Sequence, residues 1–391
     1  MTTPLRAWAA SGAMALTGHT DGPPCAAPGF PAARVATGLE RIADLTRART
    51  GTTPRLPGVN LLGERAAAMG FTRRGPVSCG GAFRTVRTGD GWLGLSLPRP
   101  TDLELIPALV EKAAVTDPWA AVLAWARERS TREAAERVEL LGLAGSAVPA
   151  PGLNSRAGVV ISQFGPRTRR RENPVIVDLT ALWAGPLCAH LLGLGGARII
   201  KVESTTRPDG ARRGSAEFFD LLHRGHDMLT LDFGDDRDID RLRALIADAD
   251  LVLESSRARA LRQLGVDATA CAAAGTSWLS ITARGRASDA VGFGDDIAVA
   301  AGLFVPDGDD LLPCGDALAD PLTGVCAAEA AAAALLADRA RLIDIAMLHL
   351  SAETAAGPVE EHTVRHDGHR WWVHTPTDRF PVAPPTARTR S

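Results

Sequence analysis

An aspartate at the start of an alanine-rich segment is the residue of this chain with the clearest capacity for chemistry. Asp320 and Pro321 precede a run, 325–339, whose alanine content strongly favours helix. An acidic residue before proline predicts a helix N-cap. The free N–H groups and the macrodipole at a helix N-terminus also keep a carboxylate ionised, and an ionised carboxylate in a cleft can form a covalent acyl intermediate. A simple helix cap and a nucleophile therefore both remain open.

The composition restricts the classes of function. The chain has 391 residues and a formal net charge of −2, which does not support non-specific binding of nucleic acid. No apolar run reaches the ~18 residues that predict a membrane-spanning helix, and the first residues lack the form of a secretory signal. The six cysteines contain no CxxC pair, so we expect reduced thiols and no metal. A cytoplasmic protein without membrane or nucleic-acid partners is predicted.

Strands and helices alternate in the second half of the chain, and this alternation predicts the fold class. The predicted strands cover 175–179, 197–203, 227–232, 250–254 and 278–282, and the predicted helices between them cover 186–193, 237–247, 258–264 and 267–273. Alternation of this kind predicts an α/β fold with a doubly wound, mostly parallel, Rossmann-like sheet.

Three regions are predicted from the change in pattern along the chain. Residues 1–160 contain alternating apolar positions at 83–97 around a Gly-Asp-Gly turn, which predict a hairpin in a smaller α+β domain. Residues 172–350 form the Rossmann-like half, and 351–391 a loop-rich tail. The basic run 167–171 lies at the junction and is expected to be a solvated linker.

The two ends of the chain also resemble each other, which indicates an internal repeat. The four matched pairs, in the same order, are 9–18 with 299–308, 36–38 with 322–324, 55–62 with 341–348 and 85–92 with 363–371. In this register Asp320 is aligned with Arg34, so only the second copy carries the carboxylate.

The ordered motifs of 175–345 resemble the family III CoA transferases, the CaiB/BaiF group that includes formyl-CoA transferase and α-methylacyl-CoA racemase. The resemblance covers, in order, VDLTALWAGP from Val177, LLGLGGARIIKVE from Leu191, HRGHDMLTLD from His223, ADLVLESS from Ala249 and AD..TG from Ala319. Residues 1–150 resemble the later half of the family, which here precedes the first half. The chain thus looks circularly permuted, or like the remnant of a tandem fusion.

The resemblance implies an activity and its partners. Asp320 would attack an acyl-CoA thioester, an aspartyl-CoA thioester would follow, and an acceptor carboxylic acid would take the CoA. Coenzyme A would be a substrate, with no permanently bound cofactor, and an interlocked homodimer is expected. The implied CoA contacts are Trp183, Arg212, Arg213, Arg224, Ser255, Ser256, Arg257, Arg259, Arg284 and Asp295; the arginines suit phosphate through bidentate bonding.

Departures from the family pattern leave two alternatives open. Asp295 stands where racemases have a histidine of the acid/base pair, and an aspartate is less suited to that role unless it is buried. A racemase or isomerase that uses Asp295 and Asp320 is one alternative. The altered segment 255–259 and the permuted order also suit a catalytically inactive homologue that binds CoA.

Overall fold

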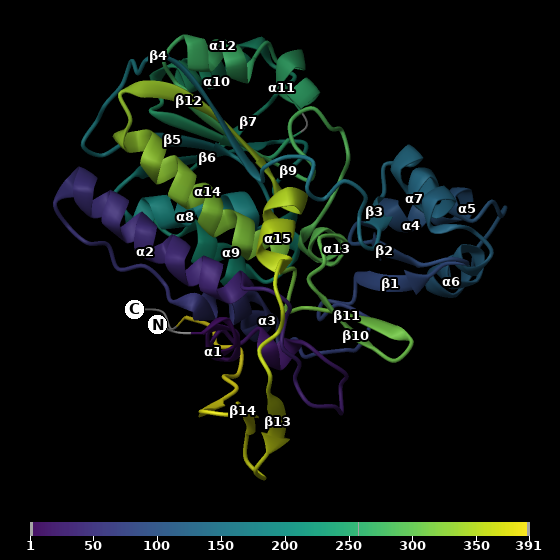
Figure 1. The fold of residues 1–391 in the computed structure, drawn as a ribbon. Helices are drawn as coiled ribbons and strands as arrows, with labels where there is room; N and C mark the ends of the chain where they lie inside the picture. Colours follow the sequence, from purple (N-terminus) through teal and green to yellow (C-terminus); the bar gives the residue numbers. More distant parts are fainter. Residues whose placement is uncertain (1–2, 257, 389–391) are drawn as a thin grey trace.

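The computed structural model describes residues 3–256 and 258–388, and of residues 258 and 259 it describes only the backbone. A seven-stranded sheet with helices on both faces forms the large domain (Figure 1). In spatial order its strands are β4 (Val159–Pro166), β12 (Arg339–Ala346), β9 (Ser277–Thr282), β8 (Leu251–Glu254), β5 (Val175–Leu179), β6 (Arg198–Ser204) and β7 (Asp227–Leu231). All neighbours pair in parallel except β4, which runs antiparallel to β12 at one edge. Counted along the chain from β5, the parallel strands have the order 3-2-1-4-5-6 of dinucleotide-binding sheets. The predicted fold class is confirmed.

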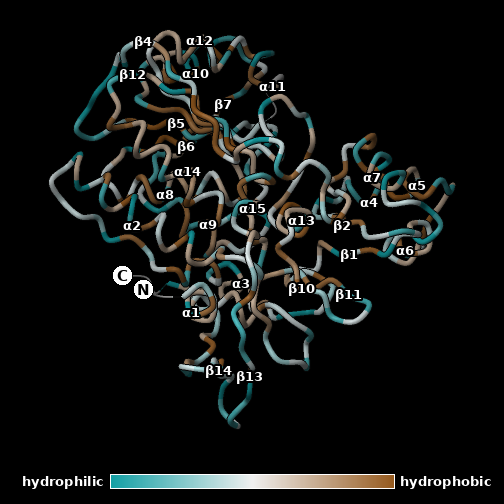
Figure 2. The backbone as a smooth tube through the Cα atoms, viewed as in Figure 1, coloured by the Kyte–Doolittle hydropathy of each residue, from teal (hydrophilic) through white to brown (hydrophobic). Residues whose placement is uncertain are grey.

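Helices cover both faces of this sheet because its strands are apolar on both sides. Side chains such as Ile176 and Ile281 face a core that includes α8 and α14, while Val177 and Trp278 face a second core that includes α10 and α12. These helices are α8 (Ala184–Leu194), α10 (Asp236–Asp248), α12 (Ala268–Ala273) and α14 (Ala319–Leu336), and α9 (Ala216–His223) and α11 (Ala258–Gln263) complete the layers. Figure 2 shows the most hydrophobic backbone in the central strands.

The small domain has its own core. Strands β1 (Phe83–Arg87), β2 (Trp92–Ser96) and β3 (Ala144–Ala147) form an antiparallel sheet covered by α4 (Pro100–Glu104), α5 (Ile106–Leu109), α6 (Pro118–Arg127) and α7 (Thr131–Leu140). The hairpin predicted at 83–97 is therefore confirmed. The buried side chains of Phe83 and Val148 pack with Val299 of α13 (Gly294–Ala300) and Leu311 of β11 (Asp310–Pro313), and so join the two domains. β11 pairs with β10 (Phe304–Asp307).

The N-terminal segment, residues 3–70, packs into the core of the large domain of its own chain. Its elements are α1 (Pro4–Ala10), η1 (Met14–Leu16), α2 (Pro31–Thr50), η2 (Val59–Gly63) and α3 (Glu64–Met69). Arg34 and Arg41 of α2 bond to Glu329 of α14 at 2.7 and 2.8 Å. Residues 1–160 are thus distributed over two packing units.

The C-terminal region also contacts the N-terminal segment. After α15 (Met347–Ala355), strands β13 (Thr363–His366), β14 (Trp371–His374) and β15 (Arg379–Pro381) form a meander in the tail that the sequence suggested to be loop-rich. The N–H of Ala383 donates to the carbonyl of Ala9 at 2.8 Å. Two chain ends that are far apart in sequence therefore share one surface.

Two local predictions and one alignment of the internal repeat differ from the structure. α14 begins at Ala319, and Leu318, without a side-chain hydrogen bond, is its N-cap, so Asp320 lies in the first turn and is not the cap. Arg167 of the expected solvated run is buried and bonds to Asp250 at 3.1 Å, because a buried acceptor far along the chain was not visible locally. The segment 55–62, aligned with β12 in the repeat, contains η2 and no strand.

Helix α14 has the length and the apolar composition of a membrane-spanning helix. Within residues 3–256 and 258–388 it is the one helix long and apolar enough to cross a membrane, yet 72% of it is buried inside the fold. Its apolar surface is therefore explained by packing against α2, α8 and the sheet.

The contact between α2 and α14 generates a prediction. A Cβ added at Gly38 would lie 2.7 Å from Val325 Cγ1, and a β-branched side chain in a helix cannot easily rotate away. Gly38→Ala should lower the free energy of unfolding by about 1–3 kcal/mol, measured by urea titration. Adding Val325→Ala should restore part of the loss, while Gly165→Ala, where an added Cβ meets nothing within 4 Å, serves as the control. A neutral Gly38→Ala would contradict the close packing of the two helices.

Candidate active site

Asp320 lies half-buried in the first turn of α14. Its backbone N–H donates to the carbonyl of Ala317 at 2.8 Å, which closes the turn that leads into the helix. The positive end of the helix dipole lies beside this carboxyl, and a hydrogen bond from the backbone of Gly294 stabilises its ionised form. Asp320 is therefore placed where a carboxylate can be both stabilised and reached.

The backbone at Gly294 approaches Asp320 very closely. A Cβ added at Gly294, the first residue of α13, would clash with Asp320 Oδ2 and with the carbonyl oxygen of Ala317. The position of the Asp320 carboxyl thus depends on a residue without a side chain at this point.

The turn before α14 is strained and is held by several segments. Ala317 has φ of 41°, a left-handed conformation that costs energy for a residue with a Cβ. Its N–H donates to Asp295 Oδ1 at 2.8 Å. The N–H of Gly315 donates to Thr17 Oγ1 at 2.8 Å, and Cys79 Sγ donates to the carbonyl of Gly315 at 3.4 Å. Residues from the first 80 positions therefore fix the approach to α14.

Arg65 of α3 brings a positive charge to the same turn. Its Nε and Nη2 donate to the two carboxylate oxygens of buried Asp316, at 2.9 and 2.5 Å. Its guanidinium also lies 4.8 Å from the ring centroid of Trp183, within the range of a cation–π contact. Trp183 is 3% exposed and packs edge-on against Phe218. This arrangement fixes both the plane and the position of the guanidinium.

Two carboxyl groups of the site have strongly raised pKa values. Burial raises the pKa of Asp320 to about 7, Arg65 opposes the rise and Asp295 adds to it. Burial also raises the pKa of Asp295 to about 6, with a further contribution from Asp316 and an opposing one from Arg65. Carboxyl groups that titrate near neutral pH are characteristic of functional sites.

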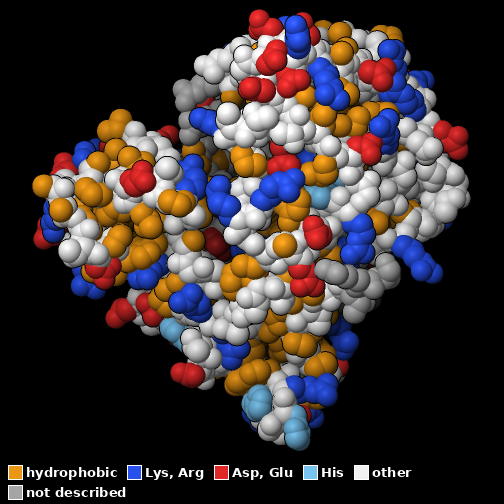
Figure 3. Space-filling view, turned by 180° about the vertical axis from the view of Figure 1, so that it is seen from behind, with side chains coloured by type: hydrophobic (Ala, Val, Ile, Leu, Met, Phe, Trp, Pro, Cys, Tyr) orange, Lys and Arg blue, Asp and Glu red, His pale blue; other side chains and the backbone are white. Residues whose placement is uncertain are grey.

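The surface between the two domains is hollowed. Figure 3 shows this hollow beside the lobe formed by the small domain, with an acidic side chain deep inside it and Lys or Arg side chains near its rim. Arg284 bridges the same two domains, since its Nη2 donates to Ser146 Oγ of β3 at 3.0 Å. Several side chains at this boundary are thus cationic, which suits an anionic ligand.

The carboxyl ends of β5 and β8 meet at the point where the strand order reverses. The N–H of Ala181, after β5, donates to Ser255 Oγ, after β8, at 3.3 Å. The hydroxyl of Ser256 is buried and has no hydrogen-bond partner in the part of the chain that the structure describes. Ligands of doubly wound sheets bind at this crevice, and the loop after β5 leads directly to Trp183.

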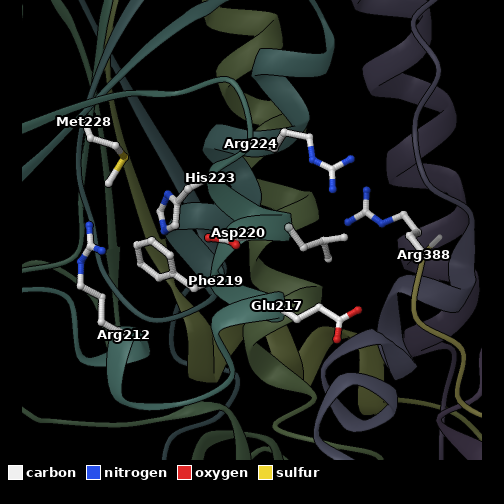
Figure 4. A pocket seen from close by; sticks show the side chains of 9 residues that line it. Arg212, Glu217, Phe219, Asp220, His223, Arg224, Met228 and Arg388 are labelled. Carbon is white, nitrogen blue, oxygen red and sulfur yellow. The ribbon is translucent and has the colours of Figure 1, made fainter. Parts of the chain in front are cut away.

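Two of the predicted arginine contacts lie elsewhere, in a cavity of about 520 Å³ over α9 (Figure 4). Arg212 bonds to Glu203 at 2.5 Å and lies over the ring of Phe219. Arg224 faces the same cavity as Arg388, whose Nη2 donates to Glu64 at 2.8 Å. Arg224 precedes β7, so it lies near the amino ends of the parallel strands and not near their carboxyl ends.

Of the remaining predicted contacts, Arg213 does not line the cavity over α9. Arg213 is exposed at the end of η3 (Gly210–Arg213). Arg257 and the side chain of Arg259 lie outside the described residues. Within residues 3–256 and 258–388, no group of three or more His, Cys, Asp or Glu side chains is arranged to hold a metal ion.

Sequence analysis did not identify Arg65 or Asp316 as site residues. Arg65 belongs to a segment without a recognised motif, and its partner is 251 residues away. Asp316 lies in the turn before α14, and its nearness in sequence to Asp320 was the one available signal.

A neighbouring buried carboxyl gives a prediction on pH dependence. Asp296 is 2% exposed, and burial raises its pKa to about 7 against hydrogen bonds from Ser96 and the N–H of Phe293. Because the pKa is raised in the folded state, the contribution of Asp296 to stability is lost as the pH rises through about 7.

Asp296→Asn keeps an acceptor oxygen and cannot ionise. It should be more stable than the wild type at pH 8 by about 1–3 kcal/mol, with little gain at pH 4, near the ordinary pKa of an aspartate in the unfolded chain. Denaturant titrations across this range measure the difference. A variant that is equally stable, or less stable, at pH 8 would contradict the raised pKa.

Comparison with known proteins locates relatives for the second half of the chain. A family model described as CoA-transferase family III matches residues 172–371. The succinyl-CoA:mesaconate CoA-transferase of Haloarcula hispanica is 34% identical over 93 residues, 21% of this chain and 24% of that protein. The probable CoA-transferase Rv1866 of Mycobacterium tuberculosis is 35% identical over 95 residues, 23% of this chain and 12% of that protein. The chain spans about a quarter or less of the length of these relatives.

Solved structures give a similar partial match. A CAIB/BAIF family protein from Brucella suis is 28% identical with a TM-score of 0.43, and the match covers 47% of this chain and 54% of that one. The protein Rv3272 from Mycobacterium tuberculosis is 25% identical with a TM-score of 0.44, over 48% and 57% of the two chains.

Proposed function

This chain belongs to CoA-transferase family III, and from that premise we propose that it moves coenzyme A from an acyl-CoA thioester to a carboxylic acid, with Asp320 as the nucleophile. The carboxylate of Asp320 attacks the thioester carbonyl, the carbon–sulfur bond breaks, and an aspartyl anhydride and CoA thiolate form. The thiolate then attacks the aspartyl carbonyl, which gives an aspartyl-CoA thioester and releases the first acid. The acceptor carboxylate attacks this thioester, which forms a second aspartyl anhydride and releases the CoA thiolate. The thiolate then attacks the acceptor carbonyl, which gives the new acyl-CoA and frees the carboxylate of Asp320.

The single observation that carries this proposal is the placement of Asp320. The carboxyl is half-buried at the N-terminus of α14, beside Arg65 and next to the glycine backbone of 294. A pKa of about 7 leaves a substantial fraction ionised at neutral pH, so a nucleophile is present without a metal. The helix N-terminus stabilises negative charge during the reaction.

The substrates are proposed by class only. An acyl-CoA and a carboxylic acid would meet at the hollow between the domains, with the crevice around Trp183, Ser255 and Ser256 as the part of the CoA site at the sheet. Arg284 would meet a phosphate or carboxylate at the domain boundary, and Arg212 and Arg224 would contact CoA only if its nucleotide extends over α9. The reaction would take place in the cytoplasm, and the interlocked homodimer stays a prediction that light scattering can test.

A racemase or isomerase is the second candidate because Asp295 also titrates near neutral pH. A pKa of about 6 is suited to a general base, and Asp295 is bonded to the turn that carries Asp320. Exchange of the α-deuteron of a 2-methylacyl-CoA with solvent would support this candidate. Transfer without exchange would support the transferase. A protein that binds CoA and does neither would be an inactive homologue.

Replacement of Asp320 tests the proposed nucleophile. Asp320→Ala should lower acyl-CoA:carboxylate exchange by at least about 10³-fold, since the covalent route is lost. Mass spectrometry of the wild type after incubation with acyl-CoA should find CoA attached to the peptide that contains Asp320. Asp44→Ala, an exposed aspartate of α2, is the control and should retain activity. Undiminished exchange in Asp320→Ala would exclude the mechanism.

Replacement of Gly294 tests the close approach at the site. Gly294→Ala should displace the Asp320 carboxyl and lower the exchange rate by about 10²-fold, because small displacements of a reacting group are costly. The thermal unfolding curve, measured in parallel, separates this effect from general destabilisation. An active Gly294→Ala variant would show that the contact is not needed.

A further inference from the structure

Arg65 is held rigidly although it comes from the N-terminal segment. Its side chain is 27% exposed, whereas the Asp316 side chain that accepts both of its hydrogen bonds is fully buried. A paired fork of this kind fixes the guanidinium plane, and the ring of Trp183 covers one face of it. The charge cannot move away without breaking a buried ion pair, which is costly.

The charge balance of the site depends on this one guanidinium. Asp295, Asp316 and Asp320 face it from α13, from the turn before α14 and from α14 itself. Cys79 faces the same group, but burial raises the pKa of its thiol well above the ordinary value, so it stays neutral. Three carboxyl groups around a single cation would repel one another strongly in its absence.

The influence between Arg65 and Asp320 is reciprocal. Arg65 lowers the pKa of Asp320 against the effect of burial. The pKa of Arg65 is raised in turn, since Asp316, with smaller contributions from Asp295 and Asp320, outweighs the opposing effect of burial. A protonated carboxyl group is a poor nucleophile, so the ionised fraction of Asp320 limits any attack that it makes.

We propose that Arg65 is a positioning residue that keeps the Asp320 carboxyl in its ionised, nucleophilic form, with Asp316 as the group that holds Arg65 in place. The proposal rests on the proposed function for the use made of the carboxylate. It assigns the N-terminal segment a part in the active site: the half that lacks a nucleophile supplies the charge that the other half requires.

The test measures the ionisation of Asp320 in the resting protein, without turnover. Carbodiimides activate the protonated carboxyl, so the pH dependence of labelling of the Asp320 peptide, read by mass spectrometry, reports its titration. Arg65→Gln should move the midpoint of labelling up by at least about one pH unit, and Asp316→Asn should move it down. The double variant should lie between the two. General damage to the fold cannot produce shifts of opposite sign.

The matched control is Arg34→Gln, which removes another half-buried arginine that bonds to α14, at Glu329. Its labelling midpoint should equal that of the wild type. The lower limb of the pH profile for exchange should follow the labelling midpoint in each variant, and Arg65→Lys should recover part of the shift. Equal midpoints in wild type, Arg65→Gln and Asp316→Asn would overturn the proposal.

The two proposals fail in distinguishable ways. If labelling shifts as expected and the wild type transfers no CoA, Arg65 controls the ionisation of Asp320 and the proposed function is wrong. If exchange proceeds and depends on Asp320 while the labelling midpoints coincide, the function stands and the role of Arg65 is overturned. Where Arg65→Gln does not fold, Arg65→Lys decides the matter: it keeps the charge but loses the paired fork to Asp316, so it should show a smaller upward shift of the labelling midpoint, and a midpoint equal to that of the wild type would overturn the role of Arg65.

Discussion

The packing of the N-terminal segment against α14 is the constraint on which the rest of the structure depends. α2 lies along α14 with a glycine at the contact, and Thr17, Arg65 and Cys79 all bond to the turn that precedes the helix. Without these contacts the left-handed conformation at residue 317 would lack much of the support that such strain requires. The position of Asp320 is therefore a property of the whole chain and not of its second half alone.

Electrostatics in this region follow from burial more than from the number of charges. The chain as a whole is nearly neutral, yet three carboxyl groups and one guanidinium share a site with little access to water. In such a setting each charge changes the ionisation of the others. Replacing a single residue of this group should therefore change the pKa values of all the other members.

Much of the large domain could be predicted from sequence because its strands are continuous apolar runs and its helices are bounded by turns. The strand predicted at 175–179 agrees with β5 to the residue, and the helix predicted at 186–193 corresponds to α8, which covers Ala184–Leu194. Asp320 was found because it precedes a strong helix signal and because the ordered motifs of 175–345 resemble a family whose nucleophile stands at this position. Arg65 was not found, since nothing local distinguishes it from a solvated arginine. Arg224 was expected to contact CoA, although it precedes β7. The sequence describes neighbours along the chain well and distant partners poorly.

The separation of the site residues along the chain has a consequence for folding. Thr17 and Gly315 are 298 residues apart, and Arg65 and Asp316 are 251 apart. Bringing two such distant residues together has an entropic cost that grows only slowly with the length of the intervening chain, as about (3/2)RT ln n. The contact can form only after both residues have been synthesised and the chain between them has become compact. During synthesis α14 and β12 emerge long after the N-terminal helices. The geometry around Asp320 should consequently assemble late, and the N-terminal helices remain unpaired until the helix that buries them has been synthesised.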